Sequence, residues 1–348
     1  MSPSRVLLTG ANGFVGSHIL SQLLGANLSV RAVVRSQSKA DAVRADFPST
    51  SLDFAIVPDI TAPSAFDEAL KSTPPFDAVI HTASPFLYRA VSNNHEFLDP
   101  AIKGTTEILR GIQRVAAQSV KRVVITSSFA AIGAFGQYDD ANKTYTSADW
   151  NPTTLEAALA TTDLGAAYRA SKKFAEKAAW DFVATEKPAF DLVVLNPPMV
   201  YGPLRHTVAS PAELNESNAR IYNLFVALAN TVDSPLPPNG LPLYVDVRDL
   251  AYAHLRALQV PEAANTRFLV TAGLVSSQQI ADIVRAEVPE LQARTPKGTP
   301  GVKGLPDAAF TADASPVQKV LGVTFRPMKE TFSDLAKQLV GIEKAQEQ

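Results

Sequence analysis

The segment YRASK places a tyrosine, Tyr168, four residues before a lysine, Lys172. Residues four positions apart lie on the same face of an α-helix, so the phenol and the ammonium group can meet. A free phenol has a pKa of about 10 and is a poor acid at neutral pH. A neighbouring ammonium stabilises the phenolate and lowers that pKa. The pair therefore predicts a general acid that can protonate a carbonyl oxygen.

A second set of polar groups ends the run KRVVITSS, about forty residues before the tyrosine. In open parallel sheets, ligands bind at the carboxyl ends of the strands, where these hydroxyl groups emerge. A serine there can hold a substrate oxygen while Tyr168 delivers the proton. The spacing does not choose between Ser127 and Ser128. The YxxxK pair alone is a weak motif, since an exposed Tyr–Lys pair has the same spacing, and it gains weight from this order along the chain.

A glycine-rich segment, LLTGANGFVGSHI, joins the first predicted strand to the first predicted helix. Glycines at these points permit a tight turn, a close approach of a pyrophosphate and close packing of helix on strand. The spacing is GxxGxxG rather than GxGxxG, and a plain strand-to-helix turn is the alternative. The position between strand and helix favours nucleotide binding. The loop candidates for this contact are Gly10, Asn12, Gly13, Phe14, Val15 and Gly16.

The second predicted strand ends in AVVRSQSK, where an NAD site commonly carries an acid for the ribose 2′-hydroxyl. This chain has Arg35 there, with Lys39 in the next turn. A guanidinium binds a phosphate in bidentate fashion, whereas a carboxylate repels it. The residues therefore favour NADPH over NADH. Asp59, after the third strand, can accept from the adenine amine or simply form a turn or a helix cap.

Short runs rich in Val, Ile and Leu alternate with helical patterns over the first two hundred residues. This alternation predicts an α/β fold with a doubly wound, Rossmann-type parallel sheet covered on both faces. The predicted strands span residues 5–9, 29–35, 51–58, 76–84, 121–128 and 190–198, and the helices 14–24, 64–72, 102–119 and 166–186.

Beyond Pro197 the prolines cluster and the alternation of strands and helices breaks down. We predict an NADPH-binding domain over residues 1–197, to which the chain returns near 240–272. Residues 198–348 then form mostly a smaller substrate-binding lobe. In the segment YVDVRD, Asp246, Arg248 and Asp249 are expected to tie the two parts together.

The composition excludes several classes of function. The chain has 348 residues, 32 Lys and Arg against 34 Asp and Glu, and no cysteine. A net charge near zero argues against nucleic acid or an anionic membrane as a partner. The missing cysteines, the strand that starts near the N-terminus and the lack of a long apolar run predict a cytoplasmic protein. The five histidines lack metal-ligand spacing, so no metal is expected.

The order of the motifs TGANGFVG, HTAS, TSS, YxxxK and NPPMVYGP resembles the extended short-chain dehydrogenases/reductases. Within that family the chain is similar to the branch of dihydroflavonol reductase, cinnamoyl-CoA reductase and the yeast and fungal NADPH-dependent methylglyoxal, aldehyde and ketone reductases. VVRSQSK, HTASPF, SKKFAEKAAW and YVDVRD point most to the last group. The resemblance implies a Rossmann fold and an NADPH-dependent reduction of an aldehyde or ketone to an alcohol.

The resemblance also implies roles for individual residues. Ser128 would be the catalytic serine, Tyr168 the acid, and Lys172 its partner and a ligand of the nicotinamide ribose. The implied cofactor contacts are Arg35 and Lys39 for the 2′-phosphate, Asp59 and Ile60 for the adenine, Thr82, Ala83 and Ser84 for the middle of the cofactor, and Pro197 with neighbouring backbone beside the nicotinamide. Thr126 and Val200 are further predicted cofactor contacts. Lys103 departs from the pattern, at a position where relatives carry an asparagine that orders a proton-relay water.

A small-molecule carbonyl compound is the expected substrate, in an apolar pocket. The candidate lining residues are Phe86, Phe129, Leu204, His206, Tyr222 and Phe225; any of these aromatic residues could instead belong to the core. A dihydroflavonol- or cinnamoyl-type reductase is the nearest alternative, and a sugar-nucleotide epimerase is a remoter one. A protein of the same fold that senses NADPH without catalysis is the alternative from another class. The sequence does not choose between a monomer and a homodimer.

Overall fold

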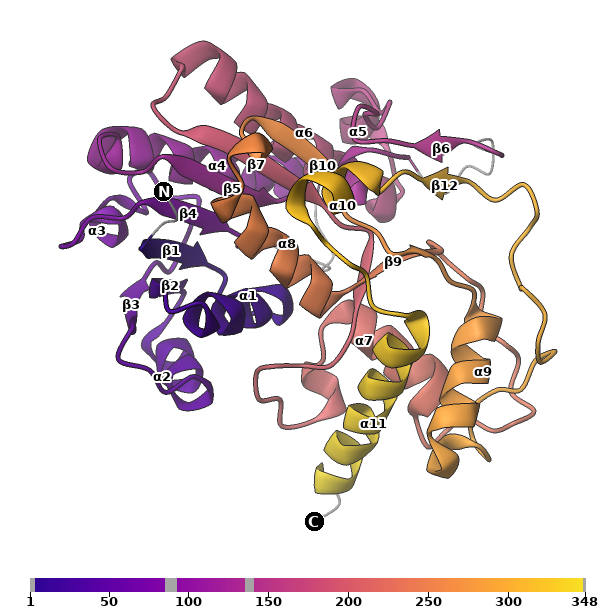
Figure 1. Ribbon diagram of the computed structural model, residues 1–348. Helices are drawn as coiled ribbons and strands as arrows, with labels where there is room; N and C mark the ends of the chain where they lie inside the picture. Colours follow the sequence, from indigo (N-terminus) through magenta and orange to yellow (C-terminus); the bar gives the residue numbers. More distant parts are fainter. Residues whose placement is uncertain (1–3, 85–92, 135–140, 347–348) are drawn as a thin grey trace.

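The computed structural model describes residues 4–84, 93–134 and 141–346. In these residues, seven parallel strands form the central sheet, in the order β10-β7-β5-β4-β1-β2-β3 (Figure 1). The order changes direction between β1 and β4, which is the point where doubly wound sheets bind ligands. The predicted fold class is therefore confirmed. The strands are β1 (Arg5–Thr9), β2 (Ser29–Val34), β3 (Leu52–Ile56), β4 (Ala78–His81), β5 (Arg122–Thr126), β7 (Asp191–Asn196) and β10 (Thr266–Leu269).

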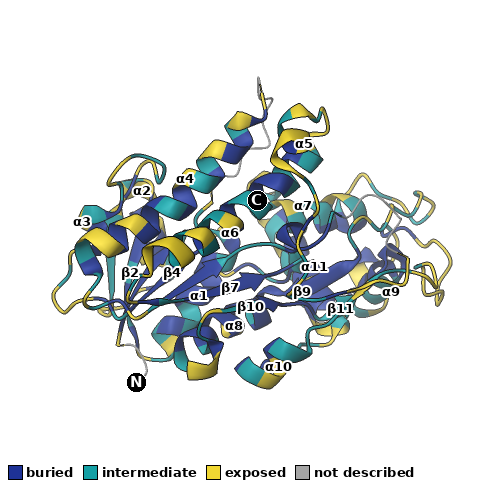
Figure 2. Ribbon diagram, turned by 90° about the horizontal axis from the view of Figure 1, so that it is seen from above, coloured by how far each residue is buried: buried dark blue, intermediate teal, exposed yellow. Residues whose placement is uncertain are grey.

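Helices cover both faces of this sheet, as Figure 2 shows from above. On one face lie α1 (Phe14–Gly25), α2 (Gln37–Asp46), α8 (Val247–Gln259) and α10 (Ser315–Leu321). On the other lie α3 (Asp67–Leu70), α4 (His95–Gly111), which continues as a π-helical turn over Ile112–Ala116, and α6 (Leu164–Glu186), with α5 (Leu155–Ala160) packed against α6. The strands are continuous apolar runs because both of their faces are buried.

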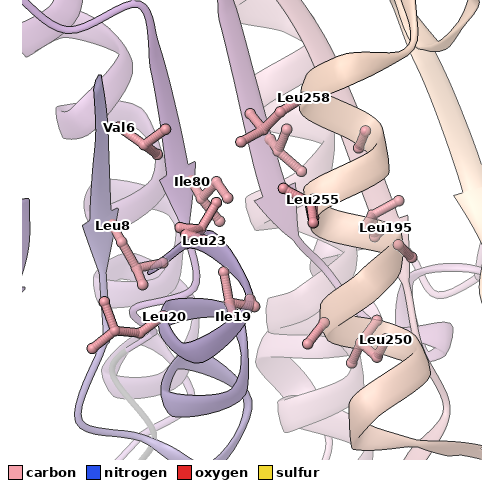
Figure 3. Close-up of a cluster of buried hydrophobic side chains, with 14 of the residues drawn as sticks. Val6, Leu8, Ile19, Leu20, Leu23, Ile80, Leu195, Leu250, Leu255 and Leu258 are labelled. Carbon is pink, nitrogen blue, oxygen red and sulfur yellow. The ribbon is translucent and has the colours of Figure 1, made fainter. Parts of the chain in front are cut away.

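The core on the α1 and α8 face is a layer of aliphatic side chains (Figure 3). Ile19 and Leu23 of α1 and Leu250 of α8 belong to one buried cluster with Val6, Leu8 and other strand residues. Leu7, between those two strand residues, joins the cluster on the opposite face. This alternation follows from the two-residue period of a strand.

A second group of elements packs around its own buried cluster, beyond the carboxyl ends of the strands. It contains a small sheet of β8 (Met199–Tyr201), β9 (Leu243–Asp246) and β11 (Gly273–Leu274). Its helices are α7 (Glu216–Ile221), extended by a π-helical turn over Tyr222–Val226, α9 (Ser277–Glu287) and α11 (Met328–Gln346). β6 (Thr144–Tyr145) pairs with β12 (Thr311–Ala312), and short 3₁₀ turns span Phe129–Ala131, Pro211–Glu213, Pro261–Ala263 and Pro289–Leu291.

Ion pairs join α8 to α11, as the segment YVDVRD predicted. The guanidinium of Arg248 binds Asp246 and Asp334, each at 2.8 Å, and Asp249 pairs with Arg326. Asp246 is also the N-cap of α8 and accepts from the Arg248 amide. The same short segment therefore starts the helix and fastens it to the last helix of the chain.

The helix predicted for residues 102–119 begins seven residues earlier, at His95, and contains Pro100. A proline lacks the amide hydrogen of its position and commonly ends a helical pattern. Here Phe97 and Leu98 are buried with Ala167 and Ala170 of α6. This tertiary packing compensates for the missing backbone hydrogen bond.

Candidate active site and cofactor site

A cavity of about 380 Å³ opens at the carboxyl ends of β1 to β4. Nine residues predicted to contact a cofactor line it: Gly10, Asn12, Gly13, Arg35, Asp59, Ile60, Thr82, Ala83 and Ser84. The sequence analysis missed six others, Thr9, Val33, Val34, Val57, Pro58 and Thr61. They are the last strand residues and their neighbours, which the predicted strand ends could have indicated.

The glycines of the first loop meet strict steric demands. Gly10 has a φ of 72°, in the left-handed region that glycine adopts without strain. A Cβ atom at Gly16 would lie 2.0 Å from the carbonyl oxygen of Gly10, so helix and loop touch backbone to backbone. The loop turns back on itself through a hydrogen bond from the Gly13 amide to the same oxygen, at 3.0 Å. These contacts place the start of α1 against the cavity, where its amides can bind an anion.

Arg35 follows β2 directly and lines the cavity. Ser36 is the N-cap of α2 and accepts from the amide of Lys39. The Lys39 side chain is exposed and is absent from the cavity lining. Asp59 accepts from the amide and hydroxyl of Thr61, at 2.8 and 2.7 Å, and these bonds hold its pKa below the usual range. Asp59 is thus a turn residue that also faces the cavity.

The residues present fit a dinucleotide that carries a 2′-phosphate. Gly10 and Gly13 line the cavity beside the first turn of α1, whose amides suit a diphosphate. The cavity side of β2 ends in the cation Arg35, with no acid between Val33 and Lys39 that would repel a phosphate.

Tyr168 and Lys172 lie on one face of α6, and both residues are half-buried. The Lys172 Nζ atom lies 5.5 Å from the centroid of the Tyr168 ring. The same atom donates to Ser84 Oγ at 2.7 Å, and Ser84 lines the cavity. Burial among the surrounding groups lowers the pKa of Lys172 to about 8. The predicted acid and its cation therefore lie at the edge of the cavity.

The two serines after β5 have different partners. Ser127 Oγ donates to the carboxylate of Glu176 at 2.5 Å. Ser128 Oγ accepts from the Ala130 amide at 3.1 Å, as the cap of the 3₁₀ turn Phe129–Ala131. A hydroxyl that accepts one bond can still donate its proton. The contacts favour Ser128 as the serine that binds substrate, and that role stays a prediction.

Thr126 was predicted to contact the cofactor, but its hydroxyl is directed elsewhere. It lies 2.6 Å from Nε2 of His254, whose Nδ1 lies 2.8 Å from the carbonyl oxygen of Leu250. A carbonyl only accepts, so Nδ1 carries the hydrogen and Nε2 accepts from Thr126. Burial lowers the pKa of His254 to about 4, which keeps this ring neutral. The threonine side chain thus points toward α8, away from the cavity.

Two residues predicted to contact the substrate, Phe129 and Phe225, are buried and line neither cavity. Phe129 is fully buried against Tyr145 and Phe310, and Phe225 is fully buried in the cluster of the second group of elements. Large apolar side chains on turns and helices fill the core in this way. A side chain without exposed surface does not line a pocket.

The remaining predicted substrate residues lie in several places. Leu204 and His206 line a second cavity of about 300 Å³, apart from the first, together with Arg205, Thr207, Val208, Gln338 and Ile342. Tyr222 Oη donates to Glu343 of α11 at 2.9 Å. Phe86 lies outside the described residues.

Four predicted cofactor contacts pack below or beside the cavity. Pro197 is buried, and its carbonyl accepts from the Phe129 amide at 2.8 Å. The Phe14 ring packs edge-on against His18, and Val15 and Val200 are partly buried beside the clusters. None of these four residues lines the cavity of about 380 Å³, and their contacts with a cofactor stay predictions.

Lys103 lies on the exposed side of α4, whereas Ala101, two residues earlier, is buried. Lys103, which replaces the asparagine expected for a proton relay, therefore has a side chain that faces solvent.

The sequence analysis missed Glu176, which lies on the same helix as the catalytic candidates Tyr168 and Lys172. Glu176 follows Lys172 by one helical turn, is buried, and binds Ser127, Asn196 and Arg267. Its spacing from Tyr168 and Lys172 on α6 was the available signal, because positions i, i+4 and i+8 share a helix face.

Among the residues that the structure describes, no group of three or more His, Asp or Glu side chains is placed to hold a metal ion. In the same residues, no helix is both long and apolar enough to cross a membrane.

Comparisons with a family model and with individual proteins give consistent results. Residues 6–271 match the family model described as the NAD dependent epimerase/dehydratase family. The chain is 39% identical over 334 residues to the ketoreductase azaE of Aspergillus niger, covering 95% of this chain and 96% of that protein. It is 36% identical over 345 residues to the NADPH-dependent methylglyoxal reductase GRE2 of Saccharomyces cerevisiae, covering 97% and 98%.

Solved structures agree. The yeast methylglyoxal/isovaleraldehyde reductase Gre2 complexed with NADPH superimposes with a TM-score of 0.90 at 35% identity, covering 98% of this chain and 99% of that chain. Gre2 from Candida albicans in complex with NADPH gives a TM-score of 0.87 at 32% identity, with the same coverage. The chain thus belongs to the NAD-dependent epimerase/dehydratase family, which is the extended branch of the short-chain dehydrogenases/reductases.

Proposed function

We propose that this protein is an NADPH-dependent carbonyl reductase that converts an aldehyde or ketone into an alcohol. One observation carries the proposal: Lys172 on α6 lies beside the Tyr168 ring and also binds Ser84, a lining residue of the cavity at the glycine-rich loop. The Lys172 ammonium group therefore lies next to both the predicted proton donor, Tyr168, and the predicted cofactor cavity. The ketoreductase and methylglyoxal reductase activities of the relatives support the same reaction class.

The residues take the following roles. Ser128 donates a hydrogen bond to the substrate oxygen, and Tyr168 gives that oxygen its proton. The Lys172 ammonium stabilises the phenolate that remains. Bound NADPH supplies the hydride. The loop from Gly10 to Gly16 would hold the diphosphate, and Arg35 with Lys39 the 2′-phosphate.

The proposal extends to the organisation of the chain. Residues 1–197, with the return near 240–272, form the NADPH-binding unit, and most of 198–348 shapes the substrate side. The return of β10 beside β7 supports this division. A cytoplasmic location and a monomer or homodimer complete the proposal, with small aldehydes and ketones, methylglyoxal among them, as the substrate class.

The test is a turnover assay that follows NADPH consumption with methylglyoxal, small α-keto esters, aryl ketones, a dihydroflavonol and a cinnamoyl thioester, each repeated with NADH. We expect turnover of small carbonyls with NADPH. The variant Tyr168→Phe should lose turnover by about 10²-fold or more, the usual range for a general acid, and should still bind NADPH. Full turnover in this variant would refute Tyr168 as the acid. If the wild type binds NADPH but turns over no compound of the panel, the alternative of a non-catalytic NADPH-sensing protein would be favoured.

A further inference from the structure

Glu176 is the most completely bound carboxylate near the proposed active site. Its side chain has no exposed surface, and it lies on α6 one turn beyond Lys172. All of its recorded partners are hydrogen-bond donors. They are Ser127 Oγ at 2.5 Å and Asn196 Nδ2 at 2.6 Å on Oε2, and Trp180 Nε1 at 3.3 Å and the Nε of Arg267 on Oε1.

This set of donors matches the capacity of a carboxylate. Two carboxylate oxygens offer about four acceptor positions, and here each oxygen receives two donors. A glutamine side chain would replace one oxygen by an NH₂ group that faces two donors. The site is therefore specific for a carboxylate, and even the isosteric amide leaves buried donors without acceptors.

The partners of Glu176 come from different elements. Two of them also bind the segment 127–133, here called the serine loop, which contains Ser127 and Ser128. Asn196, at the end of β7, uses its second amide hydrogen to bind the carbonyl oxygen of Ser128 at 3.1 Å. Arg267, on β10, donates to the carbonyl of Ala131 at 3.3 Å, in the turn that Ser128 caps. Glu176 thus links the helix of Tyr168 and Lys172 to both ends of this short turn.

Arg267 is itself held firmly. Its Nη1 donates to the carbonyl oxygens of Ser147, at 2.9 Å, and Asp149, and its guanidinium lies 3.8 Å from the ring centroid of Trp150. A planar guanidinium that stacks on a ring and already donates to two carbonyl groups loses little conformational freedom when it binds a carboxylate. The pair can therefore serve as a rigid support.

We propose that Glu176, supported by Arg267, is a positioning residue that holds Ser128 in register with Tyr168 and Lys172. The inference rests on the proposed function, in which Ser128 and Tyr168 must both reach one substrate oxygen. They come from separate elements, and the Glu176 carboxylate joins those elements through hydrogen bonds. A misplacement of about 1 Å in such a pair can lower the rate by about 10²-fold.

The test compares Glu176→Gln with a matched control, Asp191→Asn. Asp191 forms an ion pair with Arg122 at 2.6 Å, at the opposite ends of β5 and β7 from the serine loop. Both variants remove a partly or fully buried carboxylate that binds an arginine, and only one touches the serine loop. We expect kcat for carbonyl reduction to fall about 10- to 100-fold in Glu176→Gln, while the Kd for NADPH changes less than about threefold. Asp191→Asn should lower the melting temperature and keep kcat near the wild-type value.

A second measurement does not depend on turnover. Hydrogen–deuterium exchange of the full-length protein with NADPH should rise over residues 127–133 in Glu176→Gln and stay unchanged there in Asp191→Asn. If Glu176→Gln does not fold, Ser127→Ala removes a single donor, and the same segment should exchange faster with a smaller loss of kcat.

Unchanged exchange and wild-type kcat in the Glu176 variant would overturn the proposal, and so would equal losses of kcat in both variants. A wild type that reduces no carbonyl would instead refute the proposed function. In that case the exchange data would still decide whether Glu176 holds the loop.

Discussion

Gly16 meets the most severe steric demand in the cofactor loop. A Cβ atom there would lie 2.0 Å from the carbonyl oxygen and 2.8 Å from the carbonyl carbon of Gly10. Both are backbone atoms, so no side-chain rotation relieves the contact. Gly10 has little room to move away, because its amide binds the Val33 carbonyl at 3.2 Å and the Thr82 hydroxyl packs on it. We therefore expect Gly16→Ala to push α1 away from the loop.

The size of the effect follows from the overlap. Carbon–oxygen contacts are ordinarily about 3.3 Å or longer, so helix and loop must separate by more than about 1 Å. Overpacking of this kind costs about 1–3 kcal/mol. If the whole cost appears in binding, NADPH affinity falls about 5- to 150-fold, since about 1.4 kcal/mol corresponds to a factor of ten. If the loop does not move, the same cost appears as a lower free energy of unfolding.

Two glycines near Gly16 provide controls. A Cβ atom at Gly13 would lie 3.3 Å from the same Gly10 oxygen, and one at Gly25, the last residue of α1, would meet nothing within 4 Å. The assay measures NADPH binding by fluorescence and the melting temperature for all three alanine variants. Gly13→Ala should change the melting temperature only slightly but weaken NADPH binding, because Gly13 lines the cavity where the diphosphate must approach, and Gly25→Ala should leave binding intact. Wild-type affinity and stability in Gly16→Ala, or equal damage in Gly25→Ala, would refute the reasoning.

Two further predictions concern charge. Arg35→Asp should move the preference from NADPH toward NADH, because a carboxylate repels a 2′-phosphate and can bind the ribose hydroxyl; the ratio of kcat/KM for the two cofactors measures this, and an unchanged ratio would reject Arg35 as the phosphate ligand. For Lys172, whose pKa burial lowers to about 8, kcat/KM should fall as pH rises through about 8, because the ammonium is lost. The folded state then binds fewer protons than the unfolded state between about 8 and the ordinary lysine pKa of 10.5, so the Lys172 contribution to the free energy of unfolding should rise across that window. Denaturant titrations of wild type and Lys172→Met check the sign, and a loss of activity that tracks unfolding would contradict it.

The strands and the glycine loop were predictable because their signals are local. The six strands predicted in the first two hundred residues are short runs rich in aliphatic residues, and the structure places each within two or three residues of its predicted limits. Arg35 could be assigned to the cavity because a residue directly after β2 must emerge at the carboxyl edge of the sheet. Helix α9 also had a local signal, since Ser276 and Gln279 form a capping box, but the prolines around it obscured the pattern.

The sequence did not indicate the direction of several side chains, because local sequence does not specify it. Thr126 and Phe129 lie close to Ser128 in sequence, yet one binds His254 under the sheet and the other packs on Phe310. Their directions depend on how β5 pairs and where the chain turns after it. The Glu176–Arg267 pair was missed for a related reason: ninety-one residues separate its members, and only the return of β10 to the sheet brings them together.

The spacing of four residues between Tyr168 and Lys172 gains its meaning from the third position on that helix face. Four residues advance an α-helix by about 6 Å, so Tyr168, Lys172 and Glu176 descend one face in equal steps. Glu176 is fully buried and binds Ser127 after β5, Asn196 at the end of β7 and Arg267 within β10. Lys172 reaches Ser84 at the cavity wall, and Tyr168, one turn before it, is partly exposed. If the order of Tyr168 and Glu176 along α6 were reversed, the tyrosine would lie in the core and the glutamate at the cavity. The tyrosine therefore precedes the lysine because α6 begins beyond the carboxyl edge of the sheet, where the cavity opens, and runs back along the sheet face toward the start of β7.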